Sequence, residues 1–127
     1  MVIMLLIINF GSNFMIIVLV GLPGSGKTYL GKQLSKDLKI PYLEDIHILE
    51  YLPKNCIIDN PYFCLESARN KLLSFNRNFI FFYFENNPKQ CIANDKKRNR
   101  NKKATSTINY LTKKYDIINY HFPVYKG

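Results

Sequence analysis

The stretch "VGLPGSGKTYLG", residues 20–31, decides how this sequence folds. It contains Gly21-x-x-x-x-Gly26-Lys27-Thr28, which is the spacing of a phosphate-binding loop (P-loop). The backbone of such a loop turns its N–H groups toward an anion, at the positive end of a helix dipole. The residues expected to bind the phosphates of a nucleotide are Gly21, Gly24, Ser25, Gly26, Lys27 and Thr28.

Two side chains of the loop predict how the nucleotide is held. Lys27 supplies a positive charge to the β- and γ-phosphates, and the Thr28 hydroxyl is suited to ligate Mg²⁺. The Gly-x-Gly-x-x-Gly pattern of dinucleotide-binding folds is missing, because Tyr29 stands where its third glycine would fall. We therefore expect a mononucleotide site, with ATP and Mg²⁺ as cofactors.

The sequence on either side of the loop has the pattern that the motif requires. "MIIVLV" (15–20) is a continuous apolar run, typical of a strand buried on both faces of a parallel sheet. After the loop, Leu30, Leu34 and Leu38 recur at every fourth position among polar residues. This spacing predicts an amphipathic helix over 27–38.

The same alternation of strand and helix continues along the chain. Further strands are predicted at 42–45, 55–59 and 78–85, and further helices at about 61–74, from 88 onward and at 105–116, with a short helix or turn at 46–52 and an extended tail after 119. We predict an α/β P-loop NTPase fold, with an open, mostly parallel sheet of about four to five strands and helices on both faces.

Composition fits one small domain that binds an anionic partner. The 127 residues are 47% hydrophobic, which argues against disorder. Eighteen Lys and Arg against nine Asp and Glu give a formal charge of +9, and half of the basic residues lie between Lys89 and Lys114. The charge favours nucleotide phosphates or nucleic acid as the partner; a solvated helical face is the alternative.

The N-terminus is apolar but does not have the pattern of a membrane span. Its two apolar runs fall short of the roughly 20 residues that cross a bilayer, and no signal-peptide pattern is present. We expect residues 1–14 to be a dispensable extension before a kinase-like domain at 15–127; a peripheral strand or a weak membrane contact is the alternative.

The cysteines indicate a reducing compartment. Cys56, Cys64 and Cys91 form no CxxC pair, so we expect reduced thiols, a cytoplasmic location and no zinc site.

Two acids follow predicted strands at the edge of the sheet where α/β proteins bind ligands. Asp59 comes directly after "CII" and is expected to join Thr28 in holding Mg²⁺; a turn-forming Asp is the alternative. Asp45 ends the second strand and is expected to accept the proton of an attacking hydroxyl; a helix cap is the alternative. Glu44 is expected to point to the opposite side of that strand.

The basic run "NDKKRNRNKK" (94–103) lies where small phosphotransferases carry a lid. Arginine is suited to clamp the charge on a transferred phosphoryl group, so Arg98 and Arg100 are the expected lid residues, in a lid region at about 94–104. A solvated polar connection is the alternative. The further phosphate contacts expected from this run are Lys96, Lys97, Lys102 and Lys103.

The chain resembles a small P-loop kinase, and more narrowly the kinase domain of the phage polynucleotide 5′-hydroxyl kinase. The resemblance covers about residues 15–127. The matching segments are "IIVLVGLPGSGKTYL" (16–30), "NCIIDNPYFCLESARNKL" (55–72), "FYFENNPKQCIANDKKRNRN" (82–101) and "INYLTKKYDIINYHFPVYKG" (108–127), in which "FPVYKG" is the most telling part.

This resemblance implies transfer of the γ-phosphate of ATP to a nucleic-acid 5′ end. It implies Lys27 and Thr28 for ATP and Mg²⁺, Asp45 as the base on the acceptor hydroxyl, and Arg98 or Arg100 at the transferred phosphate. The segment between Asp45 and Asp59 is shorter than in that family, and no arginine closely follows Asp45.

The shorter segment leaves three functions open. The first is a kinase acting on a polynucleotide 5′-hydroxyl or a nucleotide-like acceptor. The second is a small-metabolite or nucleoside kinase, and the third is an ATP-binding protein without efficient transfer. We expect no transmembrane segment, and the sequence does not predict an oligomeric state.

Overall fold

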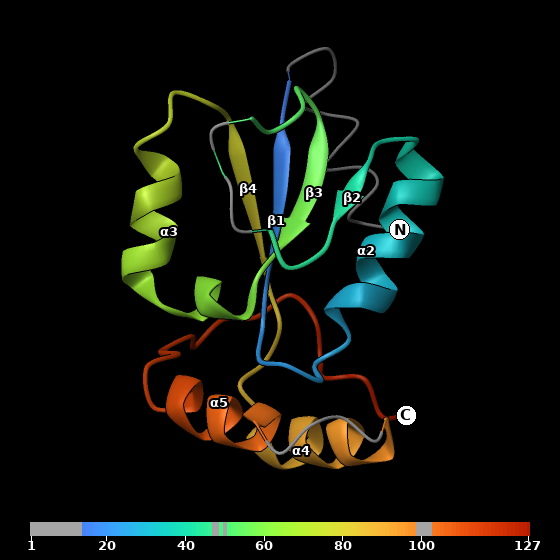
Figure 1. The fold of residues 1–127 in the computed structure, drawn as a ribbon, viewed down its shortest axis with the longest axis vertical. Coiled ribbons are helices and arrows are strands. Elements are labelled where there is room, and N and C mark those ends of the chain that lie inside the picture. Colours follow the sequence, from blue (N-terminus) through green and yellow to red (C-terminus); the bar gives the residue numbers. More distant parts are fainter. Residues whose placement is uncertain (1–13, 47–48, 50, 99–102) are drawn as a thin grey trace.

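The central strand of the sheet is the one that leads into the P-loop (Figure 1). The computed structural model describes residues 14–46, 49, 51–98 and 103–127. Its strands are β1 (Ile16–Val20), β2 (Tyr42–Leu43), β3 (Cys56–Asp59) and β4 (Phe79–Tyr83), and they form one parallel sheet in the order β2-β3-β1-β4. Its helices are α2 (Lys27–Leu38), the 3₁₀ helix η1 (Pro61–Cys64), α3 (Glu66–Leu73), α4 (Pro88–Lys97) and α5 (Lys103–Thr112).

Alternate residues of β1 are buried on opposite faces of the sheet. Ile17 and Leu19 pack with Leu34 of α2, whereas Ile16 and Val18 pack with Leu72 of α3. All five residues of β1 are fully buried, as a continuous apolar strand requires in a sheet covered on both sides. The predicted α/β fold with helices on both faces is therefore confirmed, with four strands among the described residues.

Several predicted elements differ from the structure in length or continuity. The strand predicted at 78–85 is β4 at 79–83, and the helix predicted at 105–116 is α5 at 103–112. Strand β2 ends at Leu43 and so is two residues shorter than predicted. The single helix predicted at 61–74 is divided into η1 and α3, because Leu65 between them has extended backbone angles. Asn60 caps this segment, since its side chain accepts a hydrogen bond from the Tyr62 N–H at 2.9 Å.

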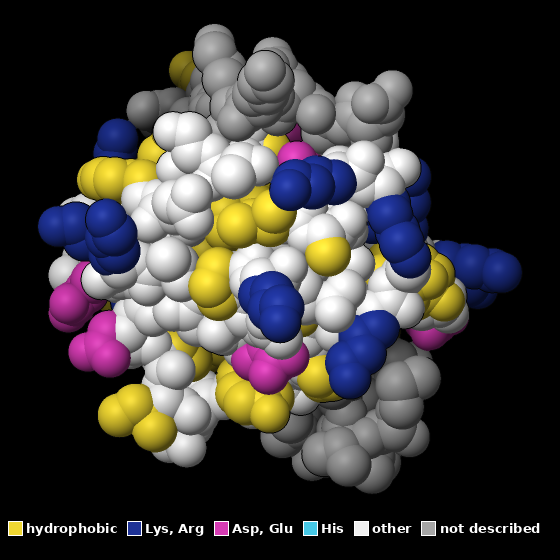
Figure 2. All heavy atoms as spheres, turned by 90° about the horizontal axis from the view of Figure 1, so that it is seen from below, with side chains coloured by type: hydrophobic (Ala, Val, Ile, Leu, Met, Phe, Trp, Pro, Cys, Tyr) yellow, Lys and Arg dark blue, Asp and Glu magenta, His cyan; other side chains and the backbone are white. Residues whose placement is uncertain are grey.

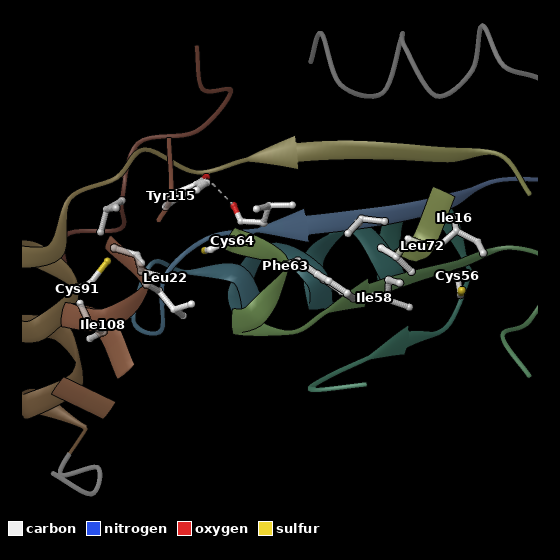
Figure 3. Close-up of a cluster of buried hydrophobic side chains, with 14 residues drawn as sticks. Ile16, Leu22, Cys56, Ile58, Phe63, Cys64, Leu72, Cys91, Ile108 and Tyr115 are labelled. Atoms are coloured by element: carbon white, nitrogen blue, oxygen red, sulfur yellow. Dashed lines mark hydrogen bonds between the residues drawn. The ribbon is translucent and has the colours of Figure 1, made fainter. Parts of the chain in front are cut away.

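Helices α4 and α5 lie beyond the carboxyl ends of the strands, next to the P-loop (Figure 1). Figure 3 shows Cys91 of α4, Ile108 of α5 and Leu22 of the P-loop together at one end of the larger apolar cluster. Each such buried aliphatic side chain contributes about 1.5–3 kcal/mol. These contacts hold α4 and α5 against the site edge of the sheet.

The tail after α5 returns to the same edge. Tyr115 donates a hydrogen bond to the Val20 carbonyl at 3.2 Å (Figure 3). Phe122 forms a single parallel bridge with Phe84. Within the described part of the chain, every helix is too short or too polar to span a bilayer. Of the segment 46–52, predicted as a short helix or turn, His47, Ile48 and Glu50 lie outside the described residues.

The three cysteines predict a test of this packing. Burial raises the pKa of the Cys56 thiol to about 11 and the pKa values of Cys64 and Cys91 to about 12. Because the thiolate is the reactive form, we expect none of them to react with Ellman's reagent in the native protein near neutral pH. All three should react once guanidinium unfolds the chain. A native cysteine that reacts as fast as a free thiol would contradict the buried placement.

Candidate nucleotide-binding site

The P-loop has the backbone geometry of an anion cradle. Gly24 and Gly26 have φ angles of 82° and 106°, in the left-handed region that glycine adopts without steric cost. A Cβ on Gly24 would lie 2.5 Å from the backbone oxygen of Cys91. Glycine is therefore required at position 24 for two reasons: the backbone angle and the close approach of α4 to the loop.

Lys27 lies at the start of α2, and its ammonium group turns back onto the loop. Its Nζ donates hydrogen bonds to the carbonyl oxygens of Gly21 at 2.9 Å and Leu22 at 3.0 Å, and the side chain is buried. Burial lowers the pKa of Lys27, and the negative charge of Asp59 opposes that shift. The ammonium group that the sequence predicts as a phosphate ligand is therefore already positioned at the loop by these two hydrogen bonds.

Ser25 and Thr28 fit a bound phosphate and its metal. The Ser25 hydroxyl is fully buried, and among the described residues it has no hydrogen-bond partner. An unpaired buried hydroxyl is costly, and a phosphate oxygen is a suitable partner for it. The Thr28 hydroxyl donates to Oε1 of Glu44 at 2.8 Å, so a hydroxyl and a carboxylate, both oxygen donors that suit Mg²⁺, lie together.

Glu44 is the site residue that the sequence argument missed. Strand alternation predicts that it points away from the loop, but β2 ends at Leu43, so alternation no longer applies at residue 44. The turn that follows brings the Glu44 carboxylate to Thr28. One sequence feature could have indicated this role. Glu44 and Asp45 are adjacent acids after a strand, and either of them could face the loop.

Asp59 is buried at the end of β3 and anchors the segment that carries Asp45. Its Oδ1 accepts a hydrogen bond from the Asp45 backbone N–H at 3.0 Å, and its Oδ2 accepts one from the Tyr42 hydroxyl. Burial raises the pKa of Asp59, while these two hydrogen bonds and the Lys27 charge act in the opposite direction. Asp59 lies close enough to Lys27 for the charge of each to affect the pKa of the other. Its predicted role as a metal ligand with Thr28 stays a prediction.

Asp45 itself is exposed and has a φ angle of 50°, a left-handed conformation that Asp tolerates. The negative charge of Asp45 acts to raise the pKa of Lys27, against the larger effect of burial. The described residues contain no group of three or more His, Cys, Asp or Glu side chains that could hold a metal on their own. Any Mg²⁺ at this edge would therefore need phosphate oxygens as further ligands.

The expected lid region belongs in part to α4, which is tied directly to the P-loop. Asn94 is buried, and its amide donates to the Gly24 carbonyl at 2.9 Å and also to the Tyr125 carbonyl. Lys97 donates to the Gly127 carbonyl at 2.5 Å. Arg98 is exposed at the end of α4. The structure thus brings α4, the loop and the tail together.

Of the other residues predicted for this region, the structure describes Lys96, which is exposed on α4. Arg100 and Lys102 lie outside the described residues, and the structure does not describe the side chain of Lys103. The predicted roles of these three residues therefore stay predictions. Figure 2, which views the molecule from the α4–α5 end, shows Lys and Arg side chains separated by apolar and uncharged groups. The described basic side chains on this face do not merge into one patch.

Comparisons with known proteins agree with the fold. No protein-family model matches the sequence. The chain is 30% identical over 122 residues to an uncharacterized protein of Acanthamoeba polyphaga mimivirus, with 83% of this chain and 88% of that protein aligned. The structure also resembles the crystal structure of a gluconokinase from Sinorhizobium meliloti 1021, with a TM-score of 0.63 and 15% identity, covering 88% of this chain and 81% of that one. This likeness shows an α/β P-loop NTPase fold.

The buried carboxyl of Asp59 predicts a pH dependence of stability. Its pKa is higher in the folded chain than the ordinary value of 3.8, so the folded state binds the proton more tightly. Stability from this group is therefore lost as pH rises from that value through the raised pKa. In Asp59→Asn this loss should disappear. Urea unfolding of both proteins from acidic to neutral pH gives the free energy of unfolding of each, and the two pH profiles are compared. A wild type that gains stability relative to Asp59→Asn as the pH rises would contradict the burial effect.

Proposed function

Since the chain belongs to the same protein family as the uncharacterized mimivirus protein and has a P-loop NTPase fold, we propose that it is an ATP-dependent phosphotransferase. One observation carries this proposal. The residues suited to bind the phosphates of ATP and the residue suited to act on the acceptor hydroxyl lie at the same edge of the sheet. Lys27 and Thr28 lie in the anion cradle, and Glu44 reaches Thr28 from the turn after β2. Asp45 follows in the same turn, anchored through its N–H to Asp59.

In the proposed reaction, ATP phosphates occupy the cradle and Lys27 turns from the loop carbonyls to the β- and γ-phosphates. Bound Mg²⁺ would neutralise phosphate charge, with Thr28 and Glu44 the residues to hold it and Asp59 next to them. The acceptor oxygen forms a bond to the γ-phosphorus as the bond to the ADP oxygen breaks. Asp45 accepts the hydroxyl proton, and ADP leaves with the bonding electrons.

For the acceptor, we propose a polynucleotide 5′-hydroxyl or a nucleotide-like hydroxyl compound. The net charge of +9 and the resemblance to the phage kinase domain support an anionic acceptor. A small hydroxylated metabolite or a nucleoside is the second candidate. It is supported by the gluconokinase neighbour and by the separated basic side chains of Figure 2, which offer no continuous track for a phosphate backbone.

Removal of the Lys27 ammonium tests nucleotide binding. In the wild type, Mg-ATP should raise the melting temperature, because a ligand that binds only the folded state stabilises it. Lys27→Ala should abolish this increase, since the phosphates lose their principal positive partner. Lys32→Ala, an exposed lysine on the same helix, is the matched control and should keep it. An equal increase in both variants would exclude the P-loop as the ATP site.

Transfer of labelled γ-phosphate tests the reaction and its acceptor. The panel is 5′-hydroxyl DNA, 5′-hydroxyl RNA, nucleosides, gluconate and water. The proposal expects label on a nucleic-acid end or a nucleotide-like acceptor. Asp45→Asn should reduce that transfer by roughly 10²–10⁴-fold, the usual contribution of a general base, while ATP affinity is kept.

Glu44→Gln is the control next to Asp45 in the chain. It should raise the Mg²⁺ concentration needed for half-maximal rate, because its carboxylate faces Thr28 and not the acceptor. Transfer of label to water alone would show that the protein hydrolyses ATP without phosphorylating an acceptor. Label on gluconate or nucleosides alone would favour the second candidate. Unchanged transfer by Asp45→Asn would show that another group accepts the proton.

A further inference from the structure

The ring of Tyr42 packs against α2 at a position where the helix has no side chain. Tyr42 is the first residue of β2 and lies opposite Ile57 of β3 in the register of the sheet. A Cβ on Gly31, in the middle of α2, would lie 2.4 Å from Cε1 of this ring and 2.7 Å from its Cζ. The ring can therefore take this place because residue 31 is glycine.

The backbone of α2 gives no other reason for a glycine at position 31. Among the described residues, the glycines with left-handed backbone angles are Gly24 and Gly26, whereas Gly31 lies inside a regular helix. Glycine in a helix interior destabilises the helix relative to alanine. The space that Gly31 leaves is filled by the Tyr42 ring, so the position of this ring is the feature that the costly residue makes possible.

The hydroxyl of Tyr42 reaches the carboxylate that holds the Asp45 backbone. It donates a hydrogen bond to Oδ2 of Asp59, and Oδ1 of the same carboxylate accepts the Asp45 N–H at 3.0 Å. Because a carboxylate is planar, a hydrogen bond that fixes the direction of one oxygen also fixes the direction of the other. The Tyr42 hydroxyl therefore sets the orientation in which Asp59 meets Asp45.

Asp45 depends on such support because its backbone conformation is unfavourable. Its φ angle of 50° is costly for a residue with a side chain, and such a conformation persists where the surrounding structure fixes it. The Asp45 side chain is exposed, so burial does not hold the turn. The next residue is fixed as well, since the Ile46 N–H donates to the Asp59 carbonyl at 3.0 Å and the Asn60 amide donates to the Ile46 carbonyl at 3.0 Å.

We propose that Tyr42 is a positioning residue for phosphoryl transfer: its hydroxyl orients Asp59, and Asp59 keeps Asp45 where it accepts the proton of the acceptor hydroxyl. The inference rests on the proposed function, in which Asp45 is the base. It adds a residue that acts on the reaction through Asp45, without touching either substrate.

Tyr42→Phe removes the hydroxyl and keeps the ring against Gly31. With whichever acceptor of the panel takes the label, kcat should fall by about tenfold to a hundredfold, since a misplacement of about 1 Å at a reacting group can cost about a hundredfold. The KM for ATP and the Mg²⁺ concentration for half-maximal rate should stay the same, because Lys27 and Thr28 keep their own partners. A rate that extra Mg²⁺ restores would overturn the inference, since the hydroxyl would then act on the metal.

A double-mutant cycle tests whether the effect passes through Asp45. In Asp45→Asn the base is already lost, so adding Tyr42→Phe should change the remaining transfer by less than about twofold. Losses that multiply would show that Tyr42 acts independently of Asp45, and would overturn the inference.

Tyr115→Phe is the matched control for the loss of a buried tyrosine hydroxyl. Its hydroxyl donates to the Val20 carbonyl at 3.2 Å, in a different part of the structure from Asp45. This variant should lose stability in urea and keep kcat within about twofold of the wild type. A loss of kcat equal to that of Tyr42→Phe would show a general effect of lower stability, and would overturn the positioning role.

Hydrogen exchange provides a readout that needs no turnover. The Asp45 amide should be protected in the wild type by its bond to Asp59, and Tyr42→Phe should accelerate its exchange by about fivefold to tenfold, the worth of one ordinary hydrogen bond. Tyr115→Phe should leave this amide unchanged. An Asp45 amide that exchanges equally in the wild type and in Tyr42→Phe would contradict the proposed link.

Gly31→Ala tests the same link from the side of the helix. The added methyl group should displace the Tyr42 ring, so transfer should slow and exchange of the Asp45 amide should accelerate, although alanine favours a helix. Lys32→Ala, at the next position of α2, is the control and should change neither. Wild-type values of both quantities in Gly31→Ala would overturn the inference.

The two proposals fail differently in these measurements. Transfer that requires Lys27 and Asp45 but is indifferent to Tyr42 removes the positioning role and leaves the phosphotransferase in place. Absence of transfer to every acceptor of the panel removes the proposed function and this inference together.

Discussion

The buried ammonium group of Lys27 is the charge around which the site is arranged. Two loop carbonyls hold it, which fixes the turn at Gly21 and Leu22 and therefore the entry into α2. Its counter-charge is Asp59 on the neighbouring strand, and both groups are shifted toward their neutral forms by burial. Each charge opposes the shift that burial imposes on the pKa of the other, and β3, which ends at Asp59, pairs with β1. The strand order that defines the fold is thus also what brings the two charges together.

A second constraint is steric, and it concerns the helix that the sequence suggested as part of a lid. Gly24 leaves room for the Cys91 carbonyl of α4, and Asn94 joins α4 to the loop and to the tail. A rigid movement of α4 would break these hydrogen bonds and uncover Cys91 and Ile108 from the apolar cluster. Each buried hydrogen bond lost costs about 1–3 kcal/mol. We therefore expect α4 as far as Asn94 to keep its place against the loop when a ligand binds.

The sequence predicted the fold from features that local chemistry determines. The strand at 15–20 and the helix at 27–38 on either side of the phosphate-loop motif each depend on a few neighbouring residues, and the structure confirms them. The predictions that failed depend on where an element stops. The end of β2 at Leu43 decides that Glu44 meets Thr28, and no local pattern marks that end. The contacts of Asn94 and Tyr125 with the loop were also not predictable, since they join residues 70 and 100 positions apart from Gly24 and Ser25.

The described site contains several features that are costly in the free protein. A lysine is buried, a carboxylate has a raised pKa, the Ser25 hydroxyl lacks a partner, and Tyr29 and Tyr125 expose aromatic surface. Elsewhere the sheet follows ordinary rules, with apolar strands covered on both faces. Departures from local stability that gather at one edge are expected where a ligand provides the missing partners. Phosphate oxygens are suitable partners for the Ser25 hydroxyl and the Lys27 ammonium group. The concentration of these costs at the P-loop edge therefore supports the proposed phosphate-binding role of this site.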